Sequence, residues 1–317
     1  MKTNREPKLD LARSLAVLPL FVGSMAALGC ASADRTEFAS PMQATDSFVT
    51  ALRNNDEKAL RAMLGPDAES VLHSGDRVAD RDNKIEFINA YDRKHAFVRA
   101  ADDEVTLTVG ESRWPMPIPI VEDDGKWTFA TEDGKDEMLA RRIGRNELDA
   151  VQVSLAIVDA QDDYARMDPD RDGLPTYANQ FFSDPGRRNG LYFPTSAGEP
   201  PSPLGPFVAQ ATLEGYKRSS SGEPTPFHGY FFRMLDGQGP HAKGGARDYF
   251  VQGHKLGGFG VVAWPASVGK SGIMTFIVNQ DGVVYEKYLG ASTDSVARSM
   301  KRFDPGPGWK KVPAAQQ

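Results

Sequence analysis

Residues Phe259–Lys287 read FGVVAWPASVGKSGIMTFIVNQDGVVYEK, and this segment is the most informative about the fold. It holds three runs rich in β-branched and aromatic residues, at 259–264, 273–278 and 283–287, and such residues favour strands. The last two runs flank Asn279-Gln280-Asp281-Gly282, a sequence typical of a hairpin turn. Strands separated by such short connections predict an antiparallel meander.

The sequence before this stretch predicts a long helix and further strands. Apolar residues recur at helical spacing from about Arg145 to Met167, which indicates a helix with one buried stripe. A dense run of Asp, Pro and Gly at 168–175 ends it. A shorter helix is predicted from Phe207 to Tyr216. Aromatic runs at 229–235 and 248–251 predict two more strands of the meander.

The region before the long helix is predicted to mix helices and strands. Ser40-Pro41 opens a helix, because serine caps helices and proline suits their first turn. Asp56 caps a second helix, and a third is predicted over 84–94. Strands are predicted at 105–109 and 126–129. Between them, an edge strand or an extended segment is predicted, because its prolines lack the ladder N–H: Pro115, Pro117 and Pro119.

The opening of this region, from Ser40-Pro41 through Leu52, Asp56 and Leu60, resembles the start of small NTF2-like domains in exported proteins. The resemblance covers about a third of the chain. It implies helices packed on a curved antiparallel sheet, which is an α+β unit. It also leaves two alternatives open for the space under the sheet, a ligand pocket or an inert scaffold.

A second resemblance covers nearly the whole chain after the N-terminal segment. Its motifs are His228-Gly229-Tyr230-Phe231-Phe232, Gly258-Phe259, Ala263-Trp264-Pro265, Thr275-Phe276-Ile277-Val278-Asn279, Asp281-Gly282-Val283-Val284-Tyr285 and, upstream, residues 140–148, 184–186 and 189–192. These motifs resemble the bacterial DUF2950 family. No activity is assigned to that family, so the resemblance implies family membership but no biochemical activity.

The second half of the chain is also similar to the globular domains of type IV pilins and pseudopilins. The likeness rests on a long helix, an irregular loop and a meander of the form G-Y-x-F … A-x-P … G-x-x-x-F-x-V-x-x-D-G-x-x-Y, which begins at Gly229. Pilins start with a helix of about 20 apolar residues that assembles the filament. Nothing like it precedes Asn146, so the resemblance implies a pilin-like head used as a module.

The N-terminal residues predict export. Four basic residues lie within the first 14 positions, an apolar run follows from Leu15 to Gly29, and small residues come next. This order is typical of a secretory signal peptide. The apolar run is too short to span a bilayer comfortably. Residues 1–29 are therefore predicted to be a signal peptide, and residues 30–37 a linker.

The single cysteine of the chain, Cys30, lies where a lipoprotein signal would end. Ala27-Leu28-Gly29-Cys30 resembles a bacterial lipobox, although the usual leucine three residues before the cysteine is Ala27 here. Ala31-Ser32-Ala33 also fits an ordinary cleavage site, which would remove Cys30. Lipidation of Cys30 is favoured because the only cysteine ends the apolar run, and simple secretion is the alternative.

The sequence therefore predicts an α+β fold in two domains. An NTF2-like domain of helices and a curved antiparallel sheet is expected over 38–142. A pilin-like domain, with a long helix packed on an antiparallel meander, is expected over 143–317. The composition agrees with a globular protein, because 40% of the residues are hydrophobic and 25% are charged.

Charge and cysteine content exclude several classes of protein. The formal net charge is −6, which is opposite to the charge expected of a nucleic-acid-binding protein. One cysteine allows neither an internal disulfide nor a cysteine-based metal site. The five histidines show no metal-ligand spacing. The chain also lacks a G-x-S-x-G nucleophile elbow, so no catalytic residue is assigned and an enzymatic role is not favoured.

Two groups of residues are candidates for binding. Asp168, Asp170 and Asp172 with Gly173 match the start of a calcium loop, although Asn179 stands where such a loop needs a bidentate Glu. A solvated, Asp-rich turn at a helix end is the alternative. Tyr230, Phe232 and Trp264 could form an aromatic platform for a carbohydrate or peptide, or could belong to the core.

The sequence as a whole predicts an exported cell-envelope protein, anchored by an acyl chain on Cys30 at the periplasmic face, in the outer membrane. Its role is predicted to be non-catalytic binding or assembly with an envelope partner, without nucleic acid and with no cofactor other than the calcium considered above. The alternative is a soluble periplasmic or secreted enzyme or small-ligand carrier that uses a pocket in either domain.

Overall fold

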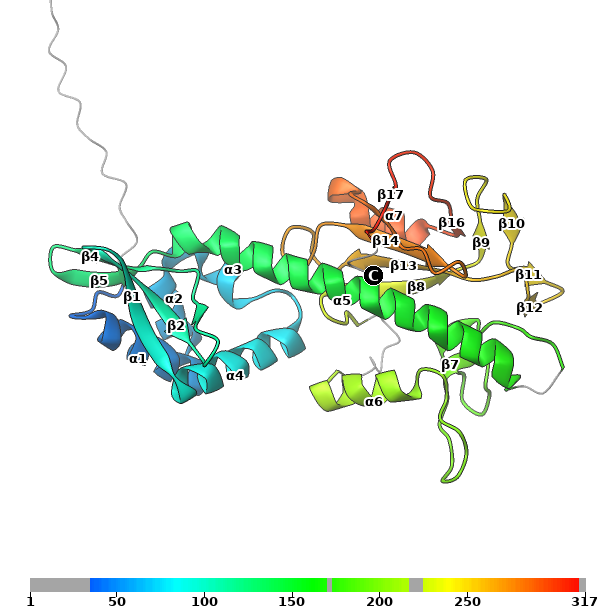
Figure 1. The fold of residues 1–317 in the computed structure, drawn as a ribbon, viewed down its shortest axis with the longest axis horizontal. Helices are drawn as coiled ribbons and strands as arrows, with labels where there is room; N and C mark the ends of the chain where they lie inside the picture. The colour runs from blue at the N-terminus through cyan, green and yellow to red at the C-terminus, as the bar shows by residue number, and fades with distance from the viewer. Residues whose placement is uncertain (1–34, 170–172, 217–224, 314–317) are drawn as a thin grey trace, which may run out of the picture. The chain divides into compact units, whose positions relative to one another are not determined.

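The computed structural model describes residues 35–169, 173–216 and 225–313 (Figure 1). These residues belong to one compact unit. In this part of the chain, none of the helices combines the length and the apolar character needed to cross a bilayer.

The first two helices begin at the caps expected from the sequence. Helix α1 spans Pro41–Asn54, and the hydroxyl of Ser40 accepts a hydrogen bond from the Gln43 N–H at 3.2 Å. Helix α2 spans Glu57–Leu64, and the Asp56 carboxylate accepts from the Ala59 N–H at 3.0 Å. Both caps satisfy N–H groups that have no partner inside their helix. Both predictions are confirmed.

The remaining elements before the long helix form a small sheet with helices packed on it. They are η1 (Gly65–Asp67), α3 (Ala68–Leu72), α4 (Arg77–Arg93), β1 (His95–Ala101), β2 (Glu104–Val109), β3 (Trp114–Pro115), β4 (Ile120–Asp123) and β5 (Lys126–Phe129). The strands are antiparallel in the order β1-β2-β4-β5, and the short, proline-containing β3 pairs with β2 at its edge. Buried side chains of α1, α2, α4 and the sheet form one apolar core.

Helix α5 spans Thr131–Met167 and links this region to the rest of the protein. It ends at the predicted residue but begins at Thr131, well before Arg145. The first turns are dominated by charged residues, so no apolar period is visible there. Gly134 lets this first part of the helix pack closely on the chain, because a Cβ at this glycine would lie 2.5 Å from the Pro117 carbonyl oxygen. The helix is continuous through the predicted domain boundary at residues 142 and 143.

After α5 the chain forms a second sheet with short accessory strands and helices. The elements are β6 (Gln180–Phe182), β7 (Gly190–Tyr192), α6 (Gly205–Glu214), β8 (Tyr230–Leu235), β9 (Gly237–Gln238), β10 (Arg247–Asp248), β11 (Phe250–Val251), β12 (His254–Lys255), β13 (Gly260–Pro265), β14 (Thr275–Asn279), β15 (Tyr285–Lys287), η2 (Gly290–Ser292), α7 (Thr293–Ser299), β16 (Arg302–Phe303) and β17 (Lys310–Lys311).

The predicted meander is confirmed. The sheet has the strand order β17-β15-β14-β13-β8, and all of its pairs are antiparallel. Every residue of β13 and β14 is buried. Val261 packs on the face covered by α5, whereas its neighbour Val262 packs with Ala297 of α7 on the other face. Burial on both faces explains the nearly continuous apolar runs in the sequence.

The predicted strand at 248–251 is divided in two. Asp248 pairs with Gly237, whereas Phe250 pairs with Lys255 of a separate hairpin. Tyr249 between them is fully buried, and its N–H donates to the Asp236 carbonyl at 2.9 Å. The strand is interrupted because Tyr249 points into the core while its neighbours turn to different partners.

The fold class predicted from the sequence, α+β, is confirmed. Helices and antiparallel sheets alternate along the chain, and the two large sheets are open and carry helices on their faces.

Candidate functional site

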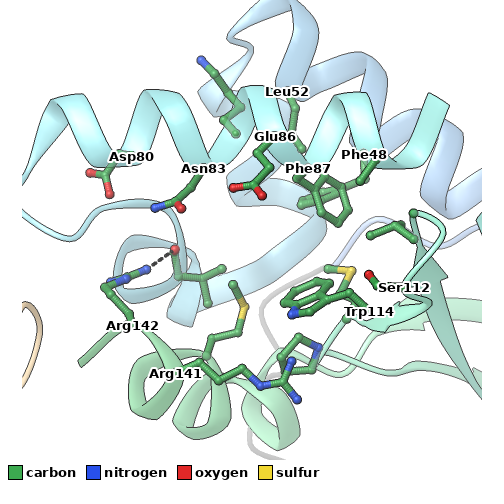
Figure 2. Close-up of a pocket in the computed structure, with 18 of the residues that line it drawn as sticks. Phe48, Leu52, Asp80, Asn83, Glu86, Phe87, Ser112, Trp114, Arg141 and Arg142 are labelled. Carbon is green, nitrogen blue, oxygen red and sulfur yellow. Dashed lines mark hydrogen bonds between the residues drawn. The ribbon is translucent and has the colours of Figure 1, made fainter. Parts of the chain in front are cut away.

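A cavity of about 760 Å³ lies between helix α4, the first half of α5 and the edge of the small sheet. Figure 2 shows Asn83 and Glu86 of α4 facing Arg141 and Arg142 of α5 across it. The volume is in the range of pockets that bind one drug-sized ligand. The cavity lies in the region where the NTF2-like resemblance placed a pocket as one of two alternatives.

Aromatic and thioether side chains form the apolar part of the cavity. Phe48 and Phe87 meet edge to face with ring centroids 6.0 Å apart, and Phe87 meets Trp114 in the same way at 6.5 Å. Met116 and Met138 complete this surface, and Met side chains adapt to the shape of what they contact. Trp114 is 38% exposed, so part of a large apolar ring faces solvent at the cavity.

Three arginines of α5 form the basic side of the cavity. The guanidinium of Arg141 lies 5.3 Å from the centre of the Trp114 ring and pairs with Glu137 at 2.7 Å. Arg142 donates to the carbonyl oxygens of Ser70 at 3.1 Å and Val71 at 2.7 Å. Burial lowers the pKa of Arg142, although the nearby Asp80 opposes this effect.

Arg145 reaches across to α4. It donates to the side-chain oxygen of Asn83 at 2.7 Å. This hydrogen bond positions both side chains at the edge of the cavity. The spacing of Arg141, Arg142 and Arg145 along α5 places them near one another, because residues three and four apart are neighbours on a helix.

Carboxylates also line the cavity, and most of them already have partners. The Asp80 carboxylate accepts from the Ser74 N–H at 3.0 Å, and Glu111 pairs with Lys94 at 2.9 Å. Glu86 is exposed on α4. The lining contains five basic residues and three acidic ones, although the chain as a whole has a net charge of −6. The cavity is therefore a local basic site with an apolar surface beside it.

A second cluster of titratable residues surrounds His228. Its Nδ1 lies 2.8 Å from Asp149 of α5, and its Nε2 lies 3.1 Å from Glu214 at the end of α6. Its backbone has a φ of +47°, in the left-handed region where histidine is tolerated better than most residues. The ring stacks on Tyr216 with centroids 5.6 Å apart.

The surroundings of His228 favour a charged imidazolium. Burial by itself would lower the pKa of His228, but the hydrogen bonds and charges of Asp149 and Glu214 outweigh burial and raise it. Ionised carboxylates only accept hydrogen bonds, so both ring nitrogens must carry a proton to bond both partners. In its protonated form, His228 donates to both carboxylates and links α5 to α6 as an ionic cluster, which we call the His228 clasp.

The buried Asp76 extends this clasp to helix α4. One carboxylate oxygen caps α4 by accepting from the Val78 and Ala79 N–H groups at 3.0 and 3.1 Å. The other oxygen accepts from the Tyr216 hydroxyl at 2.8 Å and the Gly229 N–H at 3.0 Å. The helix that lines the cavity is thus tied at its N-terminus to the segment that carries His228.

A family model described as "Protein of unknown function (DUF2950)" matches residues 35–312. The chain belongs to the DUF2950 family. The match confirms the resemblance seen in the sequence motifs. No curated protein and no solved structure matches this DUF2950 chain, so the similarity to pilins and pseudopilins is not confirmed. The NTF2-like resemblance and the two-domain division stay predictions.

Two of the three aromatic candidates are core residues of the DUF2950 protein. Tyr230 is fully buried and Trp264 is 1% exposed, and they belong to apolar clusters on opposite faces of the sheet. Phe232 is half-buried against the cluster that contains Tyr230. Trp264 donates its ring N–H to Asp294 at 3.0 Å. An aromatic platform needs exposed rings on one face, and Tyr230 and Trp264 do not provide it.

The remaining candidates fall wholly or partly outside the described residues. Asp168 follows α5 with a left-handed φ of +44°, and its carboxylate accepts from the Gly173 N–H at 3.0 Å. Asp170, Asp172 and Cys30 lie outside the described residues. Within the described parts of the chain, no group of three or more His, Cys, Asp or Glu side chains is placed to hold a metal ion. The calcium loop and the lipidation of Cys30 stay predictions.

Sequence reasoning missed the arginines of the cavity and the partners of His228. The motif Ala140-Arg141-Arg142-Ile143-Gly144-Arg145 was visible in the sequence, but only as part of the family resemblance. Its arginines line a cavity because α5 begins upstream of them and α4 lies opposite. No local pattern connects His228 to Asp149, from which it is separated by 79 positions along the chain.

Proposed function

We propose that this protein is an exported, lipid-anchored component of the bacterial cell envelope that binds a small ligand in the cavity between α4 and α5. The cavity carries this proposal, because an open space of about 760 Å³ with an apolar surface and a charged rim is what a small-molecule site requires. The proposed role is non-catalytic binding, and it is carried by the shape and lining of the cavity.

Export and anchoring are supported by the N-terminal sequence. Basic residues, a short apolar run and Cys30 follow one another in the order of a lipoprotein signal. An acyl anchor at Cys30 would hold the protein at the periplasmic face of the envelope, in the outer membrane. One acyl chain alone binds membranes only marginally, so a stable anchor needs more than one chain.

Metabolic labelling with a fatty-acid analogue tests the anchor. We expect the wild-type chain to take up the label and Cys30→Ala to take up none, since the chain has no other cysteine. Labelling that persists in Cys30→Ala would disprove lipidation at this residue. A protein that is exported but never labelled would favour the soluble periplasmic or secreted alternative.

Binding of an uncharged fluorescent probe, N-phenyl-1-naphthylamine, tests the cavity. We expect the probe to bind the full chain carrying Cys30→Ala, and decanol to displace it. Ala90→Phe, which places a ring into the cavity, should weaken probe binding at least tenfold, because it removes the space for the ligand. Asn89→Phe adds the same ring at an exposed position of the same helix and should leave binding unchanged.

A second readout does not depend on how well Ala90→Phe folds. Trp114 is one of four tryptophans in the chain and lines the cavity. A probe bound there should accept energy from Trp114, and Trp114→Phe should remove most of this transfer. Absence of probe binding to the folded protein, or binding indifferent to both Ala90→Phe and Trp114→Phe, would refute the proposed site.

A further inference from the structure

We infer that the ligand of this cavity is a free, single-chain amphiphile with one anionic head group, held between Arg142, Arg145 and Asn83 with its apolar body on Phe87 and Trp114. This inference rests on the proposed ligand-binding function and names the class of ligand.

The cavity is divided into a polar end and an apolar end. Asn83 and Arg142 lie together at one side of Figure 2, whereas Phe48, Phe87 and Trp114 gather at the other. The Arg145–Asn83 hydrogen bond of 2.7 Å places a second guanidinium at the polar end. A ligand that fills the whole space must therefore be polar at one end and apolar along the rest.

Among the described residues, no carboxylate neutralises the positive charge at the polar end by an ion pair. In the chain as described, Arg142 and Arg145 form no ion pair with a carboxylate, whereas Arg141 pairs with Glu137. Arg142 is half-buried, and its hydrogen bonds go to the neutral carbonyl oxygens of Ser70 and Val71. Buried charges are usually paired, so this guanidinium favours an anion from outside the chain.

The carboxylates nearby reduce this positive charge without cancelling it. Asp80 lies close enough to act on Arg142, but its oxygens accept hydrogen bonds from the Ser74 N–H at 3.0 and 3.1 Å. Glu111 is paired with Lys94. Glu86 projects toward the cavity from α4 and is exposed (Figure 2). An anionic head group suits the net excess of two basic residues, from five basic and three acidic ones in the lining.

The apolar end is suited to a flexible chain. Met116 and Met138 lie beside the aromatic rings, and thioether side chains adapt to irregular partners. The cavity volume of about 760 Å³ fits one ligand of drug-like size. Decanoate and decanol are suitable probes, because they share an apolar chain and differ in the charge of the head group.

Competition against N-phenyl-1-naphthylamine separates the head-group inference from the proposed function. In the full chain carrying Cys30→Ala, decanoate should displace the probe more strongly than decanol. Arg145→Gln should weaken decanoate about tenfold, as expected for loss of a charged hydrogen bond, and should leave decanol unchanged. Arg166→Gln, an exposed arginine near the far end of the same helix, is the matched control and should change neither ligand.

A variant that removes a negative charge provides a second test of the anionic head group. Glu86→Gln removes a negative charge from the lining, so it should tighten decanoate binding and leave decanol binding unchanged. Raising the ionic strength should weaken decanoate alone, because salt screens exposed charges. These readouts do not depend on the stability of Arg145→Gln.

The outcomes are distinguishable. If decanol and decanoate compete equally, and Arg145→Gln and Glu86→Gln affect neither, the anionic head group is refuted while the ligand-binding function stands. If neither compound displaces a probe, or no probe binds, the proposed function itself fails. Arg145-dependent sedimentation with phosphatidylglycerol vesicles, without displacement by decanoate, would assign the site to a membrane lipid and overturn the free ligand.

Discussion

At the scale of single residues, two glycines of α5 differ in whether a side chain would fit at their position. A Cβ at Gly134 would lie 2.5 Å from the Pro117 carbonyl oxygen, whereas a Cβ at Gly144 would meet nothing within 4 Å. We expect Gly134→Ala to destabilise the protein by about 2 kcal/mol, because backbone atoms must move. Gly144→Ala should stabilise it by about 0.5–1 kcal/mol, the cost of glycine inside a helix. Urea denaturation of both variants tests the packing of α5, and equal effects would contradict it.

Lys255 is a buried charge without a hydrogen-bond partner among the described residues. Its side chain is 1% exposed, its Nζ forms no hydrogen bond, and its ammonium lies 5.4 Å from the Phe250 ring centre. Burial lowers the pKa of Lys255 from 10.5 to about 8. Between about pH 8 and pH 10.5 the unfolded chain binds more protons than the folded protein, so the free energy of unfolding rises with pH in this range.

Replacement of Lys255 tests this assignment. We expect Lys255→Met to raise the free energy of unfolding by about 1–3 kcal/mol at pH 7, because it removes a desolvated charge. The difference in unfolding free energy between Lys255→Met and the wild type should decrease as pH rises from about 8 toward 10.5. Denaturant titrations at pH 7 and pH 10 measure it, and an advantage that does not change with pH would argue against a charged Lys255 in the folded protein.

At the scale of elements, the clasp around His228 joins α4, α5 and α6. Asp149 and Glu214 raise the pKa of His228 above its ordinary value of 6.5, against the opposing effect of burial. A raised folded-state pKa stabilises the protein fully below the unfolded pKa, and this stabilisation is lost as pH rises through the folded pKa. The clasp therefore strengthens the fold at mildly acidic pH.

The variant His228→Asn isolates this charge, because asparagine tolerates the left-handed backbone of this position. We expect it to cost about 1–2 kcal/mol at pH 5.5 and clearly less at pH 9, given that the ring is partly solvated. Asp149→Asn should reproduce the same pH dependence. Chemical denaturation between pH 5.5 and pH 9 measures the loss of unfolding free energy in each variant. A loss that does not change with pH would mean that the clasp is not ionic.

At the scale of the whole molecule, helix α5 contributes side chains to both apolar cores. Its first half carries Met138 against the first apolar core, and its second half carries Val151 and Ile157 into the second. The described chain forms one compact unit, and α5 runs without a break from one core to the other, so we expect the two halves to unfold together. Unfolding of either half should therefore remove support from the other.

Calorimetry tests this coupling with a matched pair of core variants. Leu107 and Leu191 are both fully buried, one in each core. We expect a single thermal transition for the full chain, which Leu107→Ala and Leu191→Ala each lower as a whole, at a cost of about 2–5 kcal/mol. Two transitions, with each variant shifting only one of them, would instead support two independent domains.

Features that depend on adjacent residues could be predicted from the sequence, whereas features that depend on distant contacts could not. The caps at Ser40 and Asp56 and the hairpin between β14 and β15 were predicted correctly, because a few adjacent residues determine them. The start of α5 was placed too late, because charged residues fill its first turns and Gly134 packs on a distant carbonyl. Tyr230 and Trp264 could not be assigned to core or surface until α5 and α7 covered the sheet.

The α+β class, the meander and the family could be predicted from the sequence alone, since periodicity, turn residues and motifs are properties of neighbouring positions. The position of the cavity could be seen only in the folded structure. The cavity needs α4 opposite α5, and the clasp brings Gly229 to Asp76, which is 153 positions earlier in the chain. Such contacts depend on how elements pack, because helix and strand patterns specify which faces are buried and not which partners cover them.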